Sequence, residues 1–205
     1  MIRPGKIVCV GRNYRDHAKE MGNEIPKEPL IFLKPPSSVI GTGSPIVLPR
    51  ASSHVEFEGE IGVVIGTALR RATSEEAMAA VRGVLAMNDV TARDLQRSDL
   101  QWTRAKGFDS FCPVAAAPIP DLDLDTLTIV TRVNGTEKQR ATSADMVFPI
   151  HELLAYISHI MTLEPGDLVA TGTPAGVGPL VAGDVVEVIV AGVSRVTNPV
   201  IEDEE

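Results

Sequence analysis

Three glutamates at alternate positions give this sequence its first chemical feature. Glu56, Glu58 and Glu60 lie in the segment 54–66, which ends in a β-branched run at 63–65 and predicts a single strand. Because side chains of a strand alternate between its faces, these acids are expected on one face, about 7 Å apart per two-residue step. Carboxylates at that spacing repel one another, so the face needs open water or a bound cation. An edge strand with solvated acids is the alternative to a metal site.

A histidine and a glutamate three residues apart form a second candidate group. His17 and Glu20 lie in the segment 12–22, which predicts a short helix that ends at Gly22. At this spacing the carboxylate shares a helix face with the imidazole and can orient or charge it. A surface ion pair is the alternative interpretation. Residues 23–29 are polar and contain proline, so we expect the helix to be loosely tethered and able to move as a lid.

Three further polar groups follow apolar or glycine-rich segments. The apolar run at 83–90 predicts a buried strand that ends at Asp89. Lys106 lies in a largely uncharged, aromatic-flanked loop, where a lysine is either a surface residue or an anion-binding group. The glycine-rich loop 171–178 lacks the G-K-[ST] ending of a phosphate-binding loop. It can still offer backbone N–H groups and the Thr173 hydroxyl to an anion.

The elements that must position these groups are mostly short strands. Apolar segments at 6–10, 31–34 and 46–48 predict strands, as do the turn-then-strand segments 165–170 and 182–190. Helices are predicted from a capping box at 73–76 to about residue 81, and over 148–161, which has one apolar face. Asn134 and Gly135 predict a hairpin turn. The whole chain, 1–205, is expected to form one domain, with a frayed acidic tail at 198–205.

The bulk composition excludes several classes of protein. The chain has 205 residues, 44% hydrophobic and 22% charged, with a formal net charge of -8, which is typical of a soluble globular protein. No basic stripe is present, so we expect neither nucleic acid nor a membrane as a partner. Neither a signal peptide nor an apolar run of transmembrane length is evident, which favours the cytoplasm. Cys9 and Cys112 have no C-x-x-C spacing, so neither a zinc site nor a disulfide framework is indicated.

Together these motifs resemble the fumarylacetoacetate hydrolase family. The resemblance rests on G-R-N-Y-x-x-H-x-x-E at 11–20, E-G-E-I-G-V-V-I-G at 58–66, N-D-V-T-A-R-D at 88–94, K-x-F-D at 106–109 and T-G-T-P-x-G-V-G at 171–178. The motifs follow the order of the family and cover about residues 5–180. Without an additional N-terminal domain, the chain is most similar to the small acylpyruvate hydrolases and oxaloacetate decarboxylases. The isomerases of homoprotocatechuate breakdown are also similar.

The resemblance implies a fold and a set of site residues. The fold would be α+β, a roll of mixed β-sheets with a few peripheral helices, assembled as a homodimer. Glu56 lies outside the family pattern and is left out. The residues of this sequence that match the family's site are the metal ligands Glu58, Glu60 and Asp89, the catalytic residues His17, Glu20 and Lys106, and the substrate-binding residues Arg12, Lys106 and Thr173.

The chemistry of these groups agrees with that implication. Three carboxylates are hard ligands that suit Mg²⁺ or Mn²⁺, and Ca²⁺ is an ion that crystals could contain. The expected reaction is metal-dependent C–C cleavage of a short 3-substituted pyruvate through a pyruvate enolate. Acylpyruvate hydrolysis, for example of fumarylpyruvate or acetylpyruvate, needs a base to activate water, whereas oxaloacetate decarboxylation does not. An isomerase of 2-hydroxyhepta-2,4-diene-1,7-dioate, a decarboxylase of 5-oxopent-3-ene-1,2,5-tricarboxylate and a non-catalytic relative that binds metal and small diacids remain as alternatives.

Overall fold

Two five-stranded sheets and two smaller sheets form the framework of the protein in a computed structural model, which describes residues 2–20, 22 and 24–204. Strands in the first sheet follow the order β2 (Leu30–Lys34), β1 (Ile7–Gly11), β12 (Leu168–Ala170), β6 (Gly59–Ile65) and β7 (Val81–Asn88). In the second sheet the order is β11 (Thr136–Thr142), β10 (Thr128–Val133), β14 (Val185–Val190), β15 (Ser194–Glu202) and β4 (Ile46–Leu48). The smaller sheets are β13 (Gly178–Pro179) with β5 (Val55–Phe57) and β8 (Thr91–Ala92), and β3 (Val39–Ile40) with β9 (Cys112–Pro113). The first sheet is mixed, because β1 pairs with β12 in parallel and the other neighbours pair antiparallel, which confirms the predicted α+β class.

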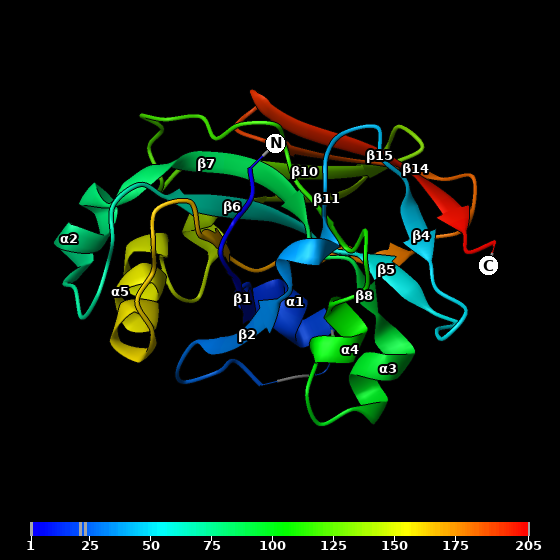
Figure 1. Ribbon diagram of the computed structural model, residues 1–205, viewed down its shortest axis with the longest axis horizontal. Helices are drawn as coiled ribbons and strands as arrows, with labels where there is room; N and C mark the ends of the chain where they lie inside the picture. Colours follow the sequence, from blue (N-terminus) through cyan, green and yellow to red (C-terminus); the bar gives the residue numbers. More distant parts are fainter. Residues whose placement is uncertain (1, 21, 23, 205) are drawn as a thin grey trace.

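Two pairs of short helices lie at separate places on this framework (Figure 1). At the left end, α2 (Ser74–Ala79) packs against α5 (Ile150–Ile160), and below β5 and β8, α3 (Arg93–Ser98) packs against α4 (Thr103–Lys106). Helix α1 (Arg15–Glu20) follows β1 directly. Thr73 and Glu76 form the predicted capping box of α2. The predicted apolar face of α5 is buried, and none of the described helices is long and apolar enough to cross a membrane.

The predicted hairpin is present, whereas the predicted fraying of 198–205 is wrong for residues 198–202. Asn134 and Gly135 have φ angles of 52° and 76°, the left-handed values that a tight hairpin turn between β10 and β11 requires. Strand β15 continues to Glu202, and its last residues pair in parallel with β4. An acidic end would fray if it had no partner. Here β4, more than 150 residues earlier in the chain, supplies one.

The acidic segment is two strands in two sheets, and the prediction of one strand over 54–66 is therefore wrong. The chain changes sheets at Glu58, whose backbone N–H donates to Asn88 Oδ1 at 2.9 Å and whose carbonyl accepts from the backbone N–H of Asp89 at 2.8 Å. Gly59 permits the change, because a Cβ there would lie 1.9 Å from Thr131 Oγ1. All seven residues of β6 are buried inside the first sheet, so the edge-strand alternative is also wrong.

Two clusters of buried apolar side chains pack around this junction. The larger cluster contains residues of β1, β6, β7, β12 and α5. The smaller cluster lies beside β5 and includes Phe57, Val90 and Phe111. Residues 58 and 89 stand at the ends of strands whose apolar neighbours are held by these clusters, so the packing fixes where their carboxylates lie.

Candidate metal-binding active site

Three buried carboxylates meet where β5 and β7 end and β6 begins. Glu58 lies at the junction of β5 and β6, Glu60 lies in β6, and Asp89 follows β7. Each side chain offers one carboxylate oxygen, and these oxygens all lie within 4.8 Å of one another. At most 4% of each residue is exposed. The structure thus brings together the three acids that the sequence predicts as metal ligands.

Buried cations compensate part of this negative charge. Lys106 Nζ lies 2.7 Å from Glu58 Oε2 and 2.7 Å from Asp89 Oδ2, and Lys34 Nζ lies 2.7 Å from Asp89 Oδ1. Lys106 is the last residue of helix α4, where the sequence predicted a loop. Only 2% of Lys106 is exposed. The Phe32 ring lies 5.0 Å from its ammonium group. The alternative interpretation of Lys106 as a surface lysine is therefore wrong.

Arg93 joins a fourth carboxylate to the cluster. Its Nε donates to Glu56 Oε2 at 2.6 Å, and its Nη1 donates to Gln96 Oε1 at 2.8 Å. Its Nη2 lies 2.6 Å from Glu58 Oε1, an ion-pair contact without hydrogen-bond alignment. Sequence reasoning left out Arg93, Lys34 and Glu56. The one signal for Arg93 and Lys34 was that buried acids need cationic partners, which does not say which residues supply them. Glu56 had the strand alternation as its signal but lay outside the family pattern.

Glu60 is the acid that this network leaves least compensated. Burial by itself would raise the pKa of Glu58, but the ion pairs with Lys106 and Arg93 outweigh it and lower that pKa. Burial and the nearby carboxylates of Asp89 and Glu58 instead raise the pKa of Glu60 well above its ordinary value. Its carboxylate accepts one hydrogen bond, from the backbone N–H of Gly172 at 2.7 Å, and no cation pairs with it within the described chain. A set of oxygen donors short of positive charge fits a hard divalent cation.

The histidine and glutamate of α1 are paired as their spacing predicts. His17 Nδ1 lies 3.2 Å from Glu20 Oε2, and His17 is 6% exposed. The Glu20 carboxylate also accepts from the backbone N–H of Gly176, which fixes α1 to the glycine-rich loop. The helix begins later than predicted, because Arg12 has a left-handed φ of 60° and cannot begin a helix. Of the expected lid, residues 21 and 23 lie outside the described residues, and its motion stays a prediction.

The glycine-rich loop closes one side of the site. Asn13 Nδ2 donates to the carbonyl of Thr171 at 2.9 Å, and Gly172 follows with a φ of 100°. A Cβ on Gly172 would lie 2.8 Å from the Cβ of Asn13, so only glycine allows this approach. Thr173 Oγ1 donates to the carbonyl of Gly59 at 2.8 Å and accepts from Gln139 Nε2 at 2.7 Å. The protein therefore fixes the hydroxyl of Thr173, and one acceptor position is left for a ligand.

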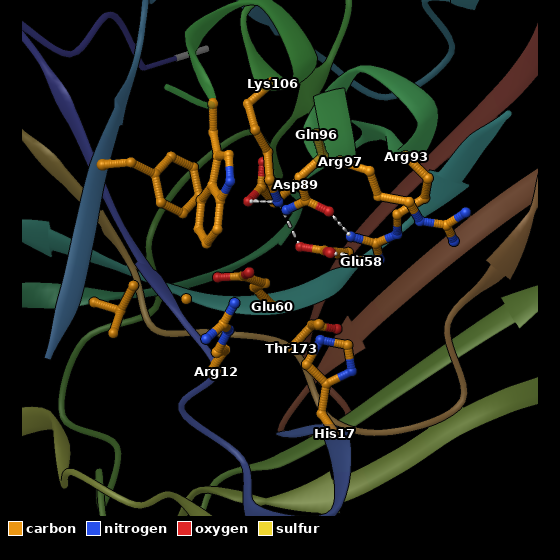
Figure 2. A pocket seen from close by; sticks show the side chains of 14 residues that line it. Arg12, His17, Glu58, Glu60, Asp89, Arg93, Gln96, Arg97, Lys106 and Thr173 are labelled. Atoms are coloured by element: carbon orange, nitrogen blue, oxygen red, sulfur yellow. Dashed lines mark hydrogen bonds and ion pairs between the residues drawn. The ribbon is translucent and has the colours of Figure 1, made fainter. Parts of the chain in front are cut away.

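A cavity of about 260 Å³ opens over the three carboxylates (Figure 2). Arg12, His17 and Thr173 lie on one side of it, and the α3 residues lie on the opposite side with Glu58, Glu60 and Asp89 between them. The predicted residues that line the cavity are Arg12, His17, Glu58, Glu60, Asp89, Lys106 and Thr173. Glu20 reaches it through His17. The lining residues that sequence reasoning did not single out are Val10, Gly11, Phe32, Arg93, Gln96, Arg97 and Trp102.

Two curated relatives of the chain are named for reactions of oxaloacetate. The mitochondrial oxaloacetate decarboxylase of Dictyostelium discoideum is 46% identical over 195 residues, which cover 91% of this chain and 89% of that protein. The oxaloacetate tautomerase YcgM of Escherichia coli is 41% identical over 199 residues, which cover 94% of this chain and 91% of that protein.

Two solved structures share the fold along nearly the whole chain. A 2-hydroxyhepta-2,4-diene-1,7-dioate isomerase from Mycobacterium marinum is 44% identical with a TM-score of 0.92, covering 100% of this chain and 77% of that one. A fumarylpyruvate hydrolase from Pseudomonas aeruginosa, in complex with Mn²⁺ and pyruvate, is 28% identical with a TM-score of 0.92. That match covers 98% of this chain and 91% of the hydrolase. The model of the fumarylacetoacetate (FAA) hydrolase C-terminal family matches residues 6–201, and the chain belongs to this family of enzymes.

Proposed function

We propose that the chain is a divalent-metal-dependent enzyme that acts on short 3-substituted pyruvates, with oxaloacetate as its first candidate substrate. The observation that carries the proposal is the buried triad of Glu58, Glu60 and Asp89, in which Glu60 has no cationic partner among the described residues. The decarboxylase and tautomerase names of the two relatives support oxaloacetate. The Mn²⁺ and pyruvate in the fumarylpyruvate hydrolase support the metal and the pyruvoyl unit.

The charge of the site supports a divalent cation and an anionic substrate together. The three acids, with Glu56, carry four negative charges when ionised, against three positive charges on Lys34, Arg93 and Lys106. Glu58, Glu60 and Asp89 would hold Mg²⁺ or Mn²⁺, which supplies positive charge for the 2-keto acid and for the enolate that forms from it. With a divalent ion the local sum becomes positive by one charge. The ion therefore adds the positive charge that attracts a keto acid anion to the three acids.

His17 is the proposed base of the reaction. Glu20 holds Nδ1 of its ring, which leaves Nε2 as the atom that takes a proton. In oxaloacetate that proton comes from C3, and its removal gives the enolate that keto–enol conversion needs. In an acylpyruvate the proton comes from a water that attacks the distal carbonyl. Lys106 neutralises negative charge as the enolate develops, and Arg12 orients the substrate anion. Thr173, whose hydroxyl proton is donated to a backbone carbonyl, can orient only a group that donates to it, such as the hydroxyl of an enol.

A second candidate function is the isomerisation of a dienol diacid. It requires the same enolate and a proton moved along a longer skeleton, so the same metal and base would serve it. The 44% identity to the heptadienedioate isomerase favours this candidate specifically. The alternative of a non-catalytic relative loses support, because the acids and the His17–Glu20 pair are all present and assembled.

Parallel assays of one metal-loaded preparation test the proposal. Purified protein with Mg²⁺ or Mn²⁺ is assayed for keto–enol conversion of oxaloacetate by its ultraviolet absorbance, and for pyruvate release from it. The same preparation is assayed on acetylpyruvate, fumarylpyruvate and the heptadienedioate. We expect turnover that a chelator abolishes and that Asp89→Asn lacks. Metal-bound protein that turns over none of these compounds would overturn the proposal. Gel filtration of the preparation tests the proposed homodimer.

A further inference from the structure

Two arginines at the cavity are not paired with carboxylates. Of the cationic residues lining it, Lys106 bridges Glu58 and Asp89, and Arg93 is held by three neighbours. The guanidinium groups of Arg12 and Arg97, by contrast, make no hydrogen bond or ion pair with another described residue. Among the cationic side chains that line the cavity, these two guanidinium groups are therefore the ones whose charge no described carboxylate compensates.

The acids closest to Arg97 along the chain are already engaged elsewhere. Asp94 accepts from the hydroxyl of Ser52 at 2.6 Å and from the backbone N–H of Ser53 at 2.8 Å. Asp99 accepts from Nε of Arg104 at 2.8 Å. An acid three residues before an arginine on a helix, as Asp94 is, would be within reach of it. Here both acids cap or pair with other groups, which leaves Arg97 to a ligand.

The two arginines lie on opposite sides of the cavity (Figure 2). Arg12 follows β1 and lies on the side of His17 and Thr173. Arg97 is in the last turn of α3, on the side of Arg93 and Gln96, and its residue is exposed. The metal-ligand acids lie between them. A molecule anchored at those acids through one end thus has a cationic group on the α3 side for its other end.

The size of the cavity leaves space beyond a pyruvoyl unit. About 260 Å³ corresponds to the volume of roughly nine water molecules in the liquid. The pyruvoyl unit has six heavy atoms, which are joined by covalent bonds and so occupy less volume than six waters. A longer substrate can therefore extend from the acids toward α3.

We propose that Arg97 binds the second, distal carboxylate of a keto diacid and so makes the enzyme select diacids over monoacids. The inference rests on the proposed function, because it takes the first carboxylate and the keto group to lie at the metal. A guanidinium group binds a carboxylate through two parallel N–H···O bonds, a geometry that a methyl group at the same place cannot use. A charge-assisted pair of this kind contributes roughly 10- to 100-fold in affinity.

Two unreactive probes of equal length isolate this contact. 2-Oxoadipate and 2-oxohexanoate have the same six-carbon skeleton, and the second carries a methyl group in place of the distal carboxylate. Calorimetry of the Mn²⁺-loaded protein should show 2-oxoadipate binding about 10-fold or more tightly than 2-oxohexanoate. In Arg97→Gln this preference should disappear, while the affinities for 2-oxohexanoate and oxalate stay within twofold. Arg97→Lys should keep part of the preference.

Matched variants separate the contact from general electrostatics. Arg140→Gln removes the same charge from β11, where the side chain pairs with Glu137 and does not line the cavity, and it should keep the full preference. A preference that survives in Arg97→Gln, or that is missing in the parent protein, would overturn the inference. Loss in Arg12→Gln with retention in Arg97→Gln would overturn it by assigning the contact to Arg12. If oxalate does not bind the Mn²⁺-loaded parent protein, the proposed function itself fails.

Discussion

The Nε atom of Arg93 donates to the Oε2 atom of Glu56 at 2.6 Å, and little of either side chain is exposed. Neither residue is a candidate metal ligand, but Arg93 also contacts Glu58, which is one. By holding Arg93, Glu56 determines how its other nitrogen approaches Glu58, where the distance is 2.6 Å. An acid outside the family pattern thus supports an acid inside it, in the way that outer partners orient the ligands of metal sites.

Replacement of Glu56 should therefore weaken metal binding without removing a ligand. In Glu56→Gln the guanidinium of Arg93 loses its charged partner and competes more strongly for Glu58. We expect the Mn²⁺ dissociation constant to rise roughly 10- to 100-fold. His54→Gln, which removes the other partner of Glu56, is the control and should stay within threefold, since that histidine side chain is 39% exposed. Unchanged Mn²⁺ binding by calorimetry in Glu56→Gln would contradict the support role.

The replacement Glu60→Gln should have opposite effects on the metal-free and the metal-bound protein. It removes a buried carboxylate that has no cationic partner among the described residues. At pH 7.5 the free energy of unfolding of the metal-free variant should therefore exceed that of the parent by about 1 kcal/mol or more. Mn²⁺ at about 100 times its dissociation constant should stabilise the parent by about 2.7 kcal/mol, raising Tm by roughly 5–10 °C. The variant should lose most of this metal-dependent rise.

Thermal and denaturant unfolding with and without Mn²⁺ measure both effects of Glu60→Gln. The control is Glu28→Gln, which removes one negative charge from an exposed residue and should follow the parent in both states. A metal-free Glu60→Gln protein that is less stable than the parent would show that Glu60 is already compensated, and that the site does not need a cation.

Loss of the Lys106 charge should impair both folding and catalysis. Lys106→Met leaves the carboxylates of Glu58 and Asp89 without their shared partner, and breaking such a buried pair costs about 3–5 kcal/mol. Bound metal should restore part of this stability. We expect kcat/KM for oxaloacetate to fall about 100-fold or more in the metal-loaded variant. Lys138→Met, at an exposed position of β11, should leave both quantities unchanged. Activity within twofold of the parent would show that Lys106 is only structural.

His17 should matter more for some reactions of the site than for others. In His17→Ala, acylpyruvate hydrolysis should fall about 10²- to 10⁴-fold, because the base that activates water is lost. Keto–enol conversion of oxaloacetate, which also needs a proton moved, should fall with it. Metal-assisted decarboxylation needs no such base and should fall much less. The three losses are measured in one preparation with its metal content checked.

The exposed histidine on α5 provides the control for this comparison. His159→Ala should leave all three rates within twofold of the parent. Equal losses of hydrolysis and decarboxylation in His17→Ala would show that His17 serves substrate binding or enolate protonation, and that it is not the water-activating base.

Local sequence determined the candidate ligands and the dyad. His17 and Glu20 pair because three helical residues bring two side chains onto one face, whatever the rest of the chain does. The turn at Asn134 and Gly135 and the cap at Thr73 are local for the same reason. The ordered motifs identified the family, and with it the three acids, although their convergence depends on strands that the motifs only imply.

Tertiary structure decided how the charges of the site are balanced. Lys34 meets Asp89 across 55 residues of sequence, and Arg93 meets Glu56 across 37. No local spacing selects these partners, because the sheets that bring them together form by long-range pairing. The same is true of the break at Glu58, where the chain leaves one sheet for another, and of β15, which β4 keeps from fraying. Whether an arginine such as Arg97 stays free for a ligand is fixed only once every nearby acid has its partner in the folded chain.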